Sequence, residues 1–434
     1  MGMRYESHFS PFPLFLLLTN SLILDNRLLI SPLYCVILVR KHCVRRIGLT
    51  ATTSKSRSML HLKPSAIREN ITGLLFILPA FLLVGLFGLF PIAYAFWISL
   101  HTWRIRQGRF IGLANYEKAL GEWSGTALFA GGFLVFIVAY FVWEKLFSGD
   151  LRRSWLGRLI NLAILAIGCL LIGLGWARMN VSGDANFLDS LPITFYYALG
   201  SVPIQLAISL VLAYILYQKI RGKEIFRVIF FLPYVTPVIA TAMVFRYIFS
   251  PRDSALANQF VTWLGFAPLQ WLFEPKNLPS LISGTAVDSF FAGPSLALVS
   301  IIMFGIWTYV GYNTVIFLAG LGSISPSIYE AAEIDGANKW QLFRHVTVPL
   351  LSPITFYLSL IGFIGTFKAF NHIYVMQVPA ALGTVETTSV AIFNTFFKAN
   401  NYGYASAEAI LLFIIILYLT YVQNRIFSEK VFYG

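Results

Sequence analysis

The chain has 434 residues, of which 57% are hydrophobic and 12% are charged, and its formal net charge is +13. A mean hydropathy of +0.72, with repeated apolar runs near the ~20 residues that cross a bilayer, is typical of a polytopic membrane protein. The basic residues lie between apolar runs rather than on one folded face, which argues against a nucleic-acid-binding protein. The three cysteines lack the spacing of a disulfide framework or a metal site, so we expect no metal.

The N-terminal segment, residues 1–70, stands apart from the rest. Its apolar stretch 11–39 is interrupted by three prolines and by Asp25, Asn26 and Arg27, and a basic stretch follows. Two interpretations stay open. The segment is an extra membrane anchor, or translation starts at Met59 and leaves a short basic cytoplasmic lead.

Eight apolar spans are predicted from residue 71 onward. Backbone amides cannot stay unpaired in lipid, so runs of this length must be helices. We therefore expect an all-α fold, a bundle of about eight transmembrane helices. The spans are roughly 71–99, 127–143, 159–177, 193–217, 228–249, 295–319, 348–370 and 405–423.

Lysine and arginine are unevenly divided between the loops. If the first span enters from the cytoplasm, the inner loops hold 20 of them in 94 residues and the outer loops hold 8 in 121 residues. The positive-inside rule favours this orientation. It places residues 320–347 and the tail 424–434 in the cytoplasm.

A polar segment, EAAEIDGANKWQLFRHVTVPLL at residues 330–351, interrupts the apolar chain. Ser325 and Pro326 suit the cap and first turn of a short helix, and Ser327 with Glu330 has the spacing of a capping box. Gly336 suits a left-handed end to that helix, after which a second helix can begin. Such a short helix is marginal alone in water and needs a surface to pack against. From the residues alone, a solvated amphipathic loop remains the plain alternative.

This segment resembles the EAA loop of bacterial binding-protein-dependent ABC importer permeases. Glu330, Ala331 and Ala332 are followed after three residues by Gly336, and the pattern ends in VTVP at 346–349, with valines at the usual Ile and Leu positions. Four further stretches resemble the sugar-type, maltose-like branch of that family. They are FIGLANYEKAL (110–120), IRGKEIFRVIFFLP (220–233), LAGLGSISPSIYEAAEIDGA (318–337) and NYGYASA (401–407).

The resemblance implies that the polar segment is a coupling helix that docks into a cleft of a separate ATP-binding subunit. It further implies a second permease subunit, two ATP-binding subunits, an extracytoplasmic solute-binding protein, and a place in the cytoplasmic (inner) membrane of a bacterium or archaeon. The sequence contains no G-x-x-x-x-G-K-[ST] motif, so we expect this chain to hold no cofactor and to be no enzyme itself, with ATP bound by its partner. By resemblance the coupling residues are Glu330, Ala331, Ala332, Asp335, Gly336 and Pro349.

A path for a carbohydrate calls for neutral hydrogen-bonding groups and aromatic platforms rather than fixed charge. Polar groups inside a membrane are costly, so Asn313 and Lys368 are candidates to line the path. Trp307, Tyr312 and Asn371 are the remaining candidates, although aromatic residues in such spans more often face lipid. The sequence does not identify the sugar, and permeases of this branch also carry glycerol phosphates.

The predicted organisation departs from the family in three regions: an inserted helix pair, a long outer loop at 250–294, and the stretch VMQVPAALGTVETT, where the family often has a Thr-x-Gly-Gly-Pro turn. Residues 71–126 hold the first transmembrane helix and an outer loop, and residues 193–423 form the permease core. Between them, 127–178 is an inserted helix pair whose role the sequence does not reveal. The alternative function is an ion-coupled secondary transporter. Such carriers place carboxylates within the bilayer, but the predicted spans contain only Glu408, close to an outer end, which weakens this alternative.

Overall fold

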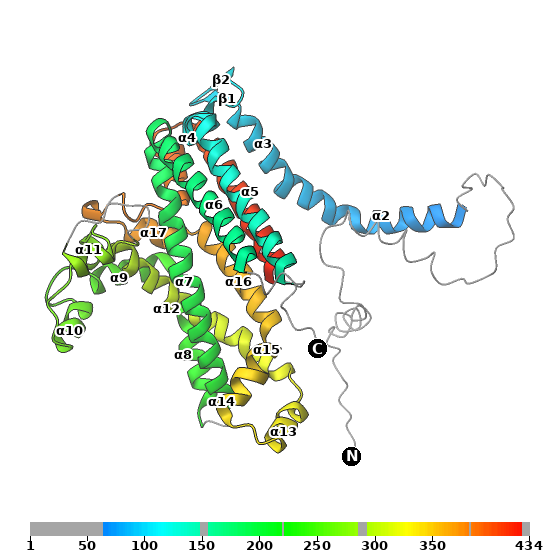
Figure 1. Cartoon of the computed structure of the whole chain (residues 1–434), viewed down its shortest axis with the longest axis vertical. Coiled ribbons are helices and arrows are strands. Elements are labelled where there is room, and N and C mark those ends of the chain that lie inside the picture. The colour runs from blue at the N-terminus through cyan, green and yellow to red at the C-terminus, as the bar shows by residue number, and fades with distance from the viewer. Residues whose placement is uncertain (1–63, 148–154, 219–220, 285–292, 382, 428–434) are drawn as a thin grey trace, which may run out of the picture. The chain divides into compact units, whose positions relative to one another are not determined.

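The computed structural model describes residues 64–147, 155–218, 221–284, 293–381 and 383–427 (Figure 1). The alternatives for the N-terminus before residue 64, and the tail from 428, lie outside these residues. The chain divides into two compact units, residues 1–79 and 80–434. The candidate site and the surfaces discussed below lie in the second unit.

The described residues are mostly helical, with loops between the helices and one β-hairpin. Helix α2 (Pro64–Val84) is followed by a π-helical turn (Gly85–Leu89), α3 (Phe90–Ser99), β1 (His101–Trp103) and β2 (Gln107–Phe110). The helices that follow are α4 (Ala114–Leu120), α5 (Trp123–Phe147), α6 (Trp155–Ser182), α7 (Ala185–Tyr217), α8 (Lys223–Val235), α9 (Val238–Ile248), α10 (Leu256–Trp263), α11 (Leu278–Ser283), α12 (Leu296–Ser323), α13 (Pro326–Ile334), α14 (Lys339–Gln341), a π-helical turn (Leu342–Thr347), α15 (Val348–Leu350), α16 (Ser352–Phe367), α17 (Asn371–Met376), α18 (Thr388–Phe393) and α19 (Tyr402–Phe427).

The predicted membrane spans are found in the structure. Six helices are long and apolar enough to cross a membrane, and two bent helix pairs bring the number to eight if each pair is one span. The predicted all-α fold with about eight transmembrane helices is therefore confirmed.

Two predicted spans are not continuous helices. The span at 228–249 consists of α8 and α9, which meet at an angle of 96°. Pro237 caps α9, and because proline has no amide hydrogen the helical hydrogen bonding stops there. The span at 348–370 belongs to a bent pair of helical segments, Lys339–Leu350 and Ser352–Phe367, which meet at an angle of 63°. A second proline, in the first turn of α16, accounts for this bend.

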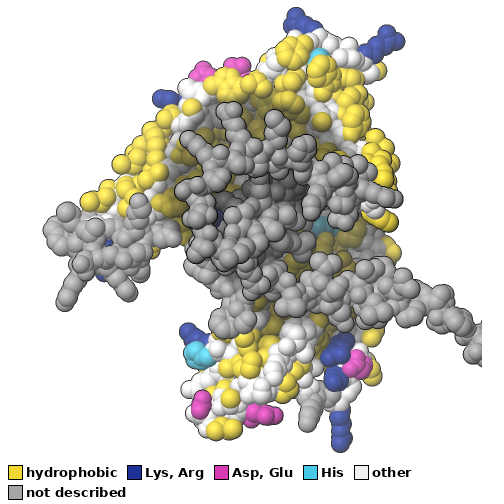
Figure 2. All heavy atoms as spheres, turned by 90° about the vertical axis from the view of Figure 1, so that its right-hand side faces the viewer, with side chains coloured by type: hydrophobic (Ala, Val, Ile, Leu, Met, Phe, Trp, Pro, Cys, Tyr) yellow, Lys and Arg dark blue, Asp and Glu magenta, His cyan; other side chains and the backbone are white. Residues whose placement is uncertain are grey.

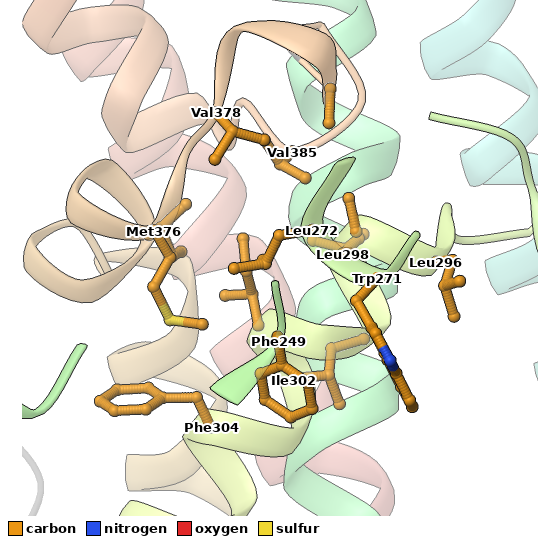
Figure 3. Close-up of a cluster of buried hydrophobic side chains, with 14 of the residues drawn as sticks. Phe249, Trp271, Leu272, Leu296, Leu298, Ile302, Phe304, Met376, Val378 and Val385 are labelled. Atoms are coloured by element: carbon orange, nitrogen blue, oxygen red, sulfur yellow. The ribbon is translucent and has the colours of Figure 1, made fainter. Parts of the chain in front are cut away.

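A buried apolar cluster surrounds the N-terminal end of α12 (Figure 3). Phe249, Trp271 and Phe304 meet there, with Phe249 and Trp271 ring centroids 5.3 Å apart. The fully buried Asn258 holds the adjoining loop, because its Oδ1 accepts from the Trp271 indole at 2.7 Å and from the Leu269 amide at 2.9 Å. This loop is therefore packed onto the helical core.

Helices α5 and α6 pack closely through glycines. A Cβ at Gly132 would lie 2.9 Å from the carbonyl oxygen of Gly168, and a Cβ at Gly175 would lie 2.8 Å from that of Gly125. Small residues let helix backbones approach each other in lipid, where there is no hydrophobic force to drive helices together. The predicted pair at 127–178 corresponds to these two helices, which together extend from Trp123 to Ser182.

Candidate functional site

The polar segment forms short helices at the end of α12, beyond the apolar span. Helix α13 ends in a left-handed turn at Gly336, whose φ is +84°. The amide of Gly336 donates to the Glu333 carbonyl, and the amide of Ala337 donates to the Ala332 carbonyl, both at 3.0 Å. These bonds satisfy the last carbonyls of the helix. The predicted turn at Gly336 is thus confirmed.

The predicted capping box at Ser327 and Glu330 is wrong. The N-cap is Ser325, as predicted, with proline at 326 in the first turn, and Ser325 Oγ lies 2.8 Å from Ser327 Oγ. A capping box occurs instead at the start of α14. The Gln341 amide donates to Asn338 Oδ1 at 2.9 Å, and the Asn338 amide donates to Gln341 Oε1 at 2.8 Å.

The surface of α13 and α14 is open to a partner. The predicted coupling residues are exposed, except for the half-buried Ala332; the exposed ones are Glu330, Ala331, Asp335, Gly336 and Pro349. Among the described residues the one ion pair joins Arg227 to Glu224, so the carboxylates of α13 have no described cation beside them. Ile334 and Trp340 are 86% and 65% exposed. The surface therefore combines free carboxylates with large apolar side chains.

Two contacts tie this surface to the transmembrane helices. Tyr329 Oη of α13 lies 3.1 Å from Oγ1 of Thr347, which is buried just before the span continues. The Phe343 ring packs edge-on against Tyr214, near the end of α7, with centroids 4.8 Å apart. A displacement of the short helices would therefore reach both α7 and α16.

A row of aromatic side chains lies where α12 faces the bend between α8 and α9. Tyr312 stacks on Tyr234 of α8 with centroids 4.5 Å apart, and Tyr309 lies 6.0 Å from the same ring. Further along α12, Trp307 contacts Phe245 of α9 at 4.9 Å. Sequence reasoning named Trp307 and Tyr312 but missed Tyr234 and Phe245. Pro233 and Pro237, on either side of Tyr234, could have indicated a helix break there.

The other predicted path residues are dispersed. Asn313 is buried within α12, with 5% of its surface exposed. Lys368 and Asn371 are exposed at the junction of α16 and α17. In the described part of the chain, no hydrogen bond or ring contact joins Lys368 or Asn371 to Trp307 or Tyr312. The two aromatic candidates contact different helices, Trp307 through Phe245 of α9 and Tyr312 through Tyr234 of α8.

Next to that junction, His372 is buried and shares a 2.7 Å hydrogen bond with Tyr197 Oη. Burial lowers the pKa of His372 to about 4, so the ring is neutral at physiological pH. Within the described ranges no group of three His, Cys, Asp or Glu side chains is arranged to hold a metal ion.

Residues 205–433, which include the bend, the aromatic row and the polar segment, match the family described as "Binding-protein-dependent transport system inner membrane component". The arabinooligosaccharides transport system permease protein of Bacillus subtilis is 27% identical over 317 residues, 72% of this chain and 90% of that protein. The trehalose/maltose transport system permease protein of Thermococcus litoralis is 26% identical over 361 residues, 83% of this chain and 94% of that protein.

The lactose transport system permease protein of Rhizobium radiobacter is 25% identical over 386 residues, 88% of this chain and 99% of that protein. A solved structure of a bacterial alginate ABC transporter, in complex with an alginate pentasaccharide-bound periplasmic protein, aligns with a TM-score of 0.47 at 20% identity, over 65% of this chain and 96% of that chain. The matched family covers more than half of the 434 residues. The chain therefore belongs to the inner membrane components of binding-protein-dependent transport systems, and it is a permease subunit of an ABC importer.

Proposed function

We propose that this permease moves a sugar or related carbohydrate into the cytoplasm and that its polar segment couples transport to a separate ATPase subunit. The observation that carries the coupling role is the exposed α13 surface, which has carboxylates without described cations and is linked to the spans through Tyr329 and Thr347. The sugar relatives named above support the substrate class.

In the proposed mechanism, α13 docks into a cleft of the ATPase. Glu330 and Asp335 would pair with basic or amide groups of the partner, because charge-assisted hydrogen bonds are stronger than neutral ones. Ala331 and Ala332 would allow close approach of the partner backbone. Gly336 would set the turn and Pro349 the start of the following span. When the ATPase closes, the movement passes to α16 through Thr347 and to α7 through the Phe343–Tyr214 contact.

The proposed path runs beside the aromatic row. Sugar rings present weakly apolar faces to aromatic side chains and hydroxyls to polar ones. Trp307 and Tyr312 would act as platforms, with Tyr234 holding Tyr312 by stacking. Asn313, Lys368 and Asn371 would supply hydrogen bonds at other depths of the path.

The proposed complex contains a second permease subunit, two ATP-binding subunits and an extracytoplasmic solute-binding protein. ATP would be bound by the ATPase subunits rather than by this chain. The complex would lie in the cytoplasmic (inner) membrane of a bacterium or archaeon.

The test is ATP hydrolysis by the reconstituted complex, with the binding protein loaded from a panel of sugars. We expect one loaded sugar to stimulate hydrolysis and Glu330→Lys to abolish this stimulation while the chain stays inserted. Glu117→Lys is the matched control, because Glu117 is also an exposed helical glutamate but belongs to α4. Unchanged stimulation in Glu330→Lys would refute the coupling role. Sugar uptake by the chain without any ATPase subunit would overturn the proposed function and return attention to the buried Glu408.

A further inference from the structure

The β-hairpin between α3 and α4 has a defined geometry. His101 pairs with Phe110 and Trp103 pairs with Gln107 in antiparallel register, so residues 104–106 form the turn. Gly108 packs against the Thr102 backbone, where a Cβ would overlap the carbonyl oxygen. The pairing and this close approach hold the turn in one orientation.

The base of the hairpin is fixed to the helices. Asn115 of α4 donates from Nδ2 to the carbonyl of Ser99 at 2.7 Å and to that of His101 at 3.2 Å. The buried His101 ring bonds the Trp97 carbonyl through Nδ1 at 2.8 Å. At the start of α19, a Cβ at Gly403 would lie 2.9 Å from the Trp103 amide nitrogen. The hairpin is therefore held at its base by α3, by α4 and by the start of α19.

Three arginines project from this hairpin. Arg104 and Arg106 lie in the turn and Arg109 lies on β2, and all three are exposed. Between residues 101 and 116 the sequence contains no acidic residue, and in the described chain none of the three forms an ion pair. Ile105 and Phe110, interleaved with them, are 84% and 64% exposed. Figure 2 shows Lys and Arg side chains projecting beside hydrophobic ones at the upper end of the molecule, where Figure 1 places the hairpin.

This surface lies at the opposite end of the bundle from the coupling helices. At the start of α7, the Asp184 amide donates to the Lys118 carbonyl of α4 at 3.1 Å, and near its end Tyr214 contacts Phe343. The 33 residues of α7 span about 50 Å at about 1.5 Å per residue. If the coupling helices are cytoplasmic, the arginines are outside, where basic residues are otherwise sparse.

We propose that Arg104, Arg106 and Arg109 form a docking surface for an acidic patch on the solute-binding protein. This inference rests on the proposed function. Guanidinium groups pair with carboxylates through two parallel hydrogen bonds, and a turn held rigid at its base loses little freedom on docking. Apolar side chains among the charges match the composition of protein interfaces. Charge complementarity of this kind chiefly speeds association and makes it dependent on salt.

The test measures binding of the fluorescently labelled cognate solute-binding protein to the full complex in phosphatidylcholine nanodiscs. We expect the triple variant Arg104→Gln, Arg106→Gln, Arg109→Gln to bind about tenfold more weakly at low salt, with a flatter salt dependence. The matched control, Arg178→Gln, Arg252→Gln, Lys276→Gln, removes three exposed cations elsewhere on the same side and should bind as the wild type does. Arg106→Glu should weaken binding more than Arg106→Gln.

Subunit stoichiometry and the melting temperature of the purified complexes show whether each variant has assembled. Equal affinity and salt dependence in the wild type and the assembled triple variant would overturn the inference. A defect that requires phosphatidylglycerol in the nanodiscs would assign the arginines to lipid headgroups and would also overturn it. If no loaded binding protein stimulates even the wild-type complex, the proposed function fails instead, so the two failures are distinguishable.

Discussion

Replacing Gly311 with alanine should force α8 and α12 apart. A Cβ at this position would overlap the carbonyl oxygen of Phe230 and lie 2.9 Å from the Phe231 amide nitrogen, closer than the 3.0 Å that real Cβ atoms keep. The obstacle is backbone, which cannot rotate away as a side chain can. Overpacking of a well-packed interior costs about 1–3 kcal/mol. The same movement would separate Tyr234 from Tyr312, which follows Gly311 directly.

Gly322→Ala provides the matched control, because Gly322 lies in the same helix and a Cβ there would meet nothing within 4 Å. Both variants gain up to about 1 kcal/mol of helix propensity, so their difference in stability isolates the clash. Thermal unfolding of the purified complex should place Gly311→Ala several degrees below Gly322→Ala, and sugar-stimulated ATP hydrolysis should fall with it. Equal melting temperatures for the two variants would show that α8 and α12 do not approach as closely as described.

Three further substitutions test separate parts of the structure. Gly336→Ala places a side chain at φ +84°, a strain of about 1–2 kcal/mol, and should lower coupled ATP hydrolysis, with Gly336→Asn less affected. Tyr234→Ala should slow sugar transport several-fold by removing the stacking partner of Tyr312, whereas the exposed Tyr247→Ala should not. The pKa of buried His372 is about 4, against 6.5 for the free group. The unfolded chain therefore takes up the proton first, and stability should fall as the pH drops from 6.5 towards 4. His372→Gln should reduce the loss, and an identical pH profile in the variant would rule out His372 as its source.

The positions of the membrane spans could be predicted because bilayer thickness sets a minimum apolar length. Apolar length does not indicate whether the helix axis is straight, which is why the 96° bend between α8 and α9 was missed. An apolar run reads alike whether its helix is straight or broken, and here proline marks the break. The pairing of Tyr234 with Tyr312 depends on helix packing between distant segments, which periodicity along one segment does not contain.

The candidate coupling segment was predicted in part. The turn at Gly336 was predictable because a glycine directly after a short helix commonly adopts the left-handed conformation that ends it, and Gly336 does so with φ +84°. The capping box was misplaced because two stretches have the required spacing, Ser327 with Glu330 and Asn338 with Gln341. Proline at 326 excludes the first of these two stretches, because it places the N-cap at Ser325 and leaves Ser327 within the first helical turn.

The bend between α8 and α9 has a consequence for what surrounds the chain at that depth. Some of the backbone carbonyls at the bend have hydrogen-bond donors within the chain. Thr236 donates through its amide to the Leu232 carbonyl at 3.2 Å and through Oγ1 to the Pro233 carbonyl at 2.7 Å. Thr236 is half-buried and Pro237 is exposed. Hydrocarbon does not tolerate irregular backbone, which persists within a membrane where protein or water covers it. The bend therefore faces a subunit boundary or a hydrated vestibule rather than acyl chains.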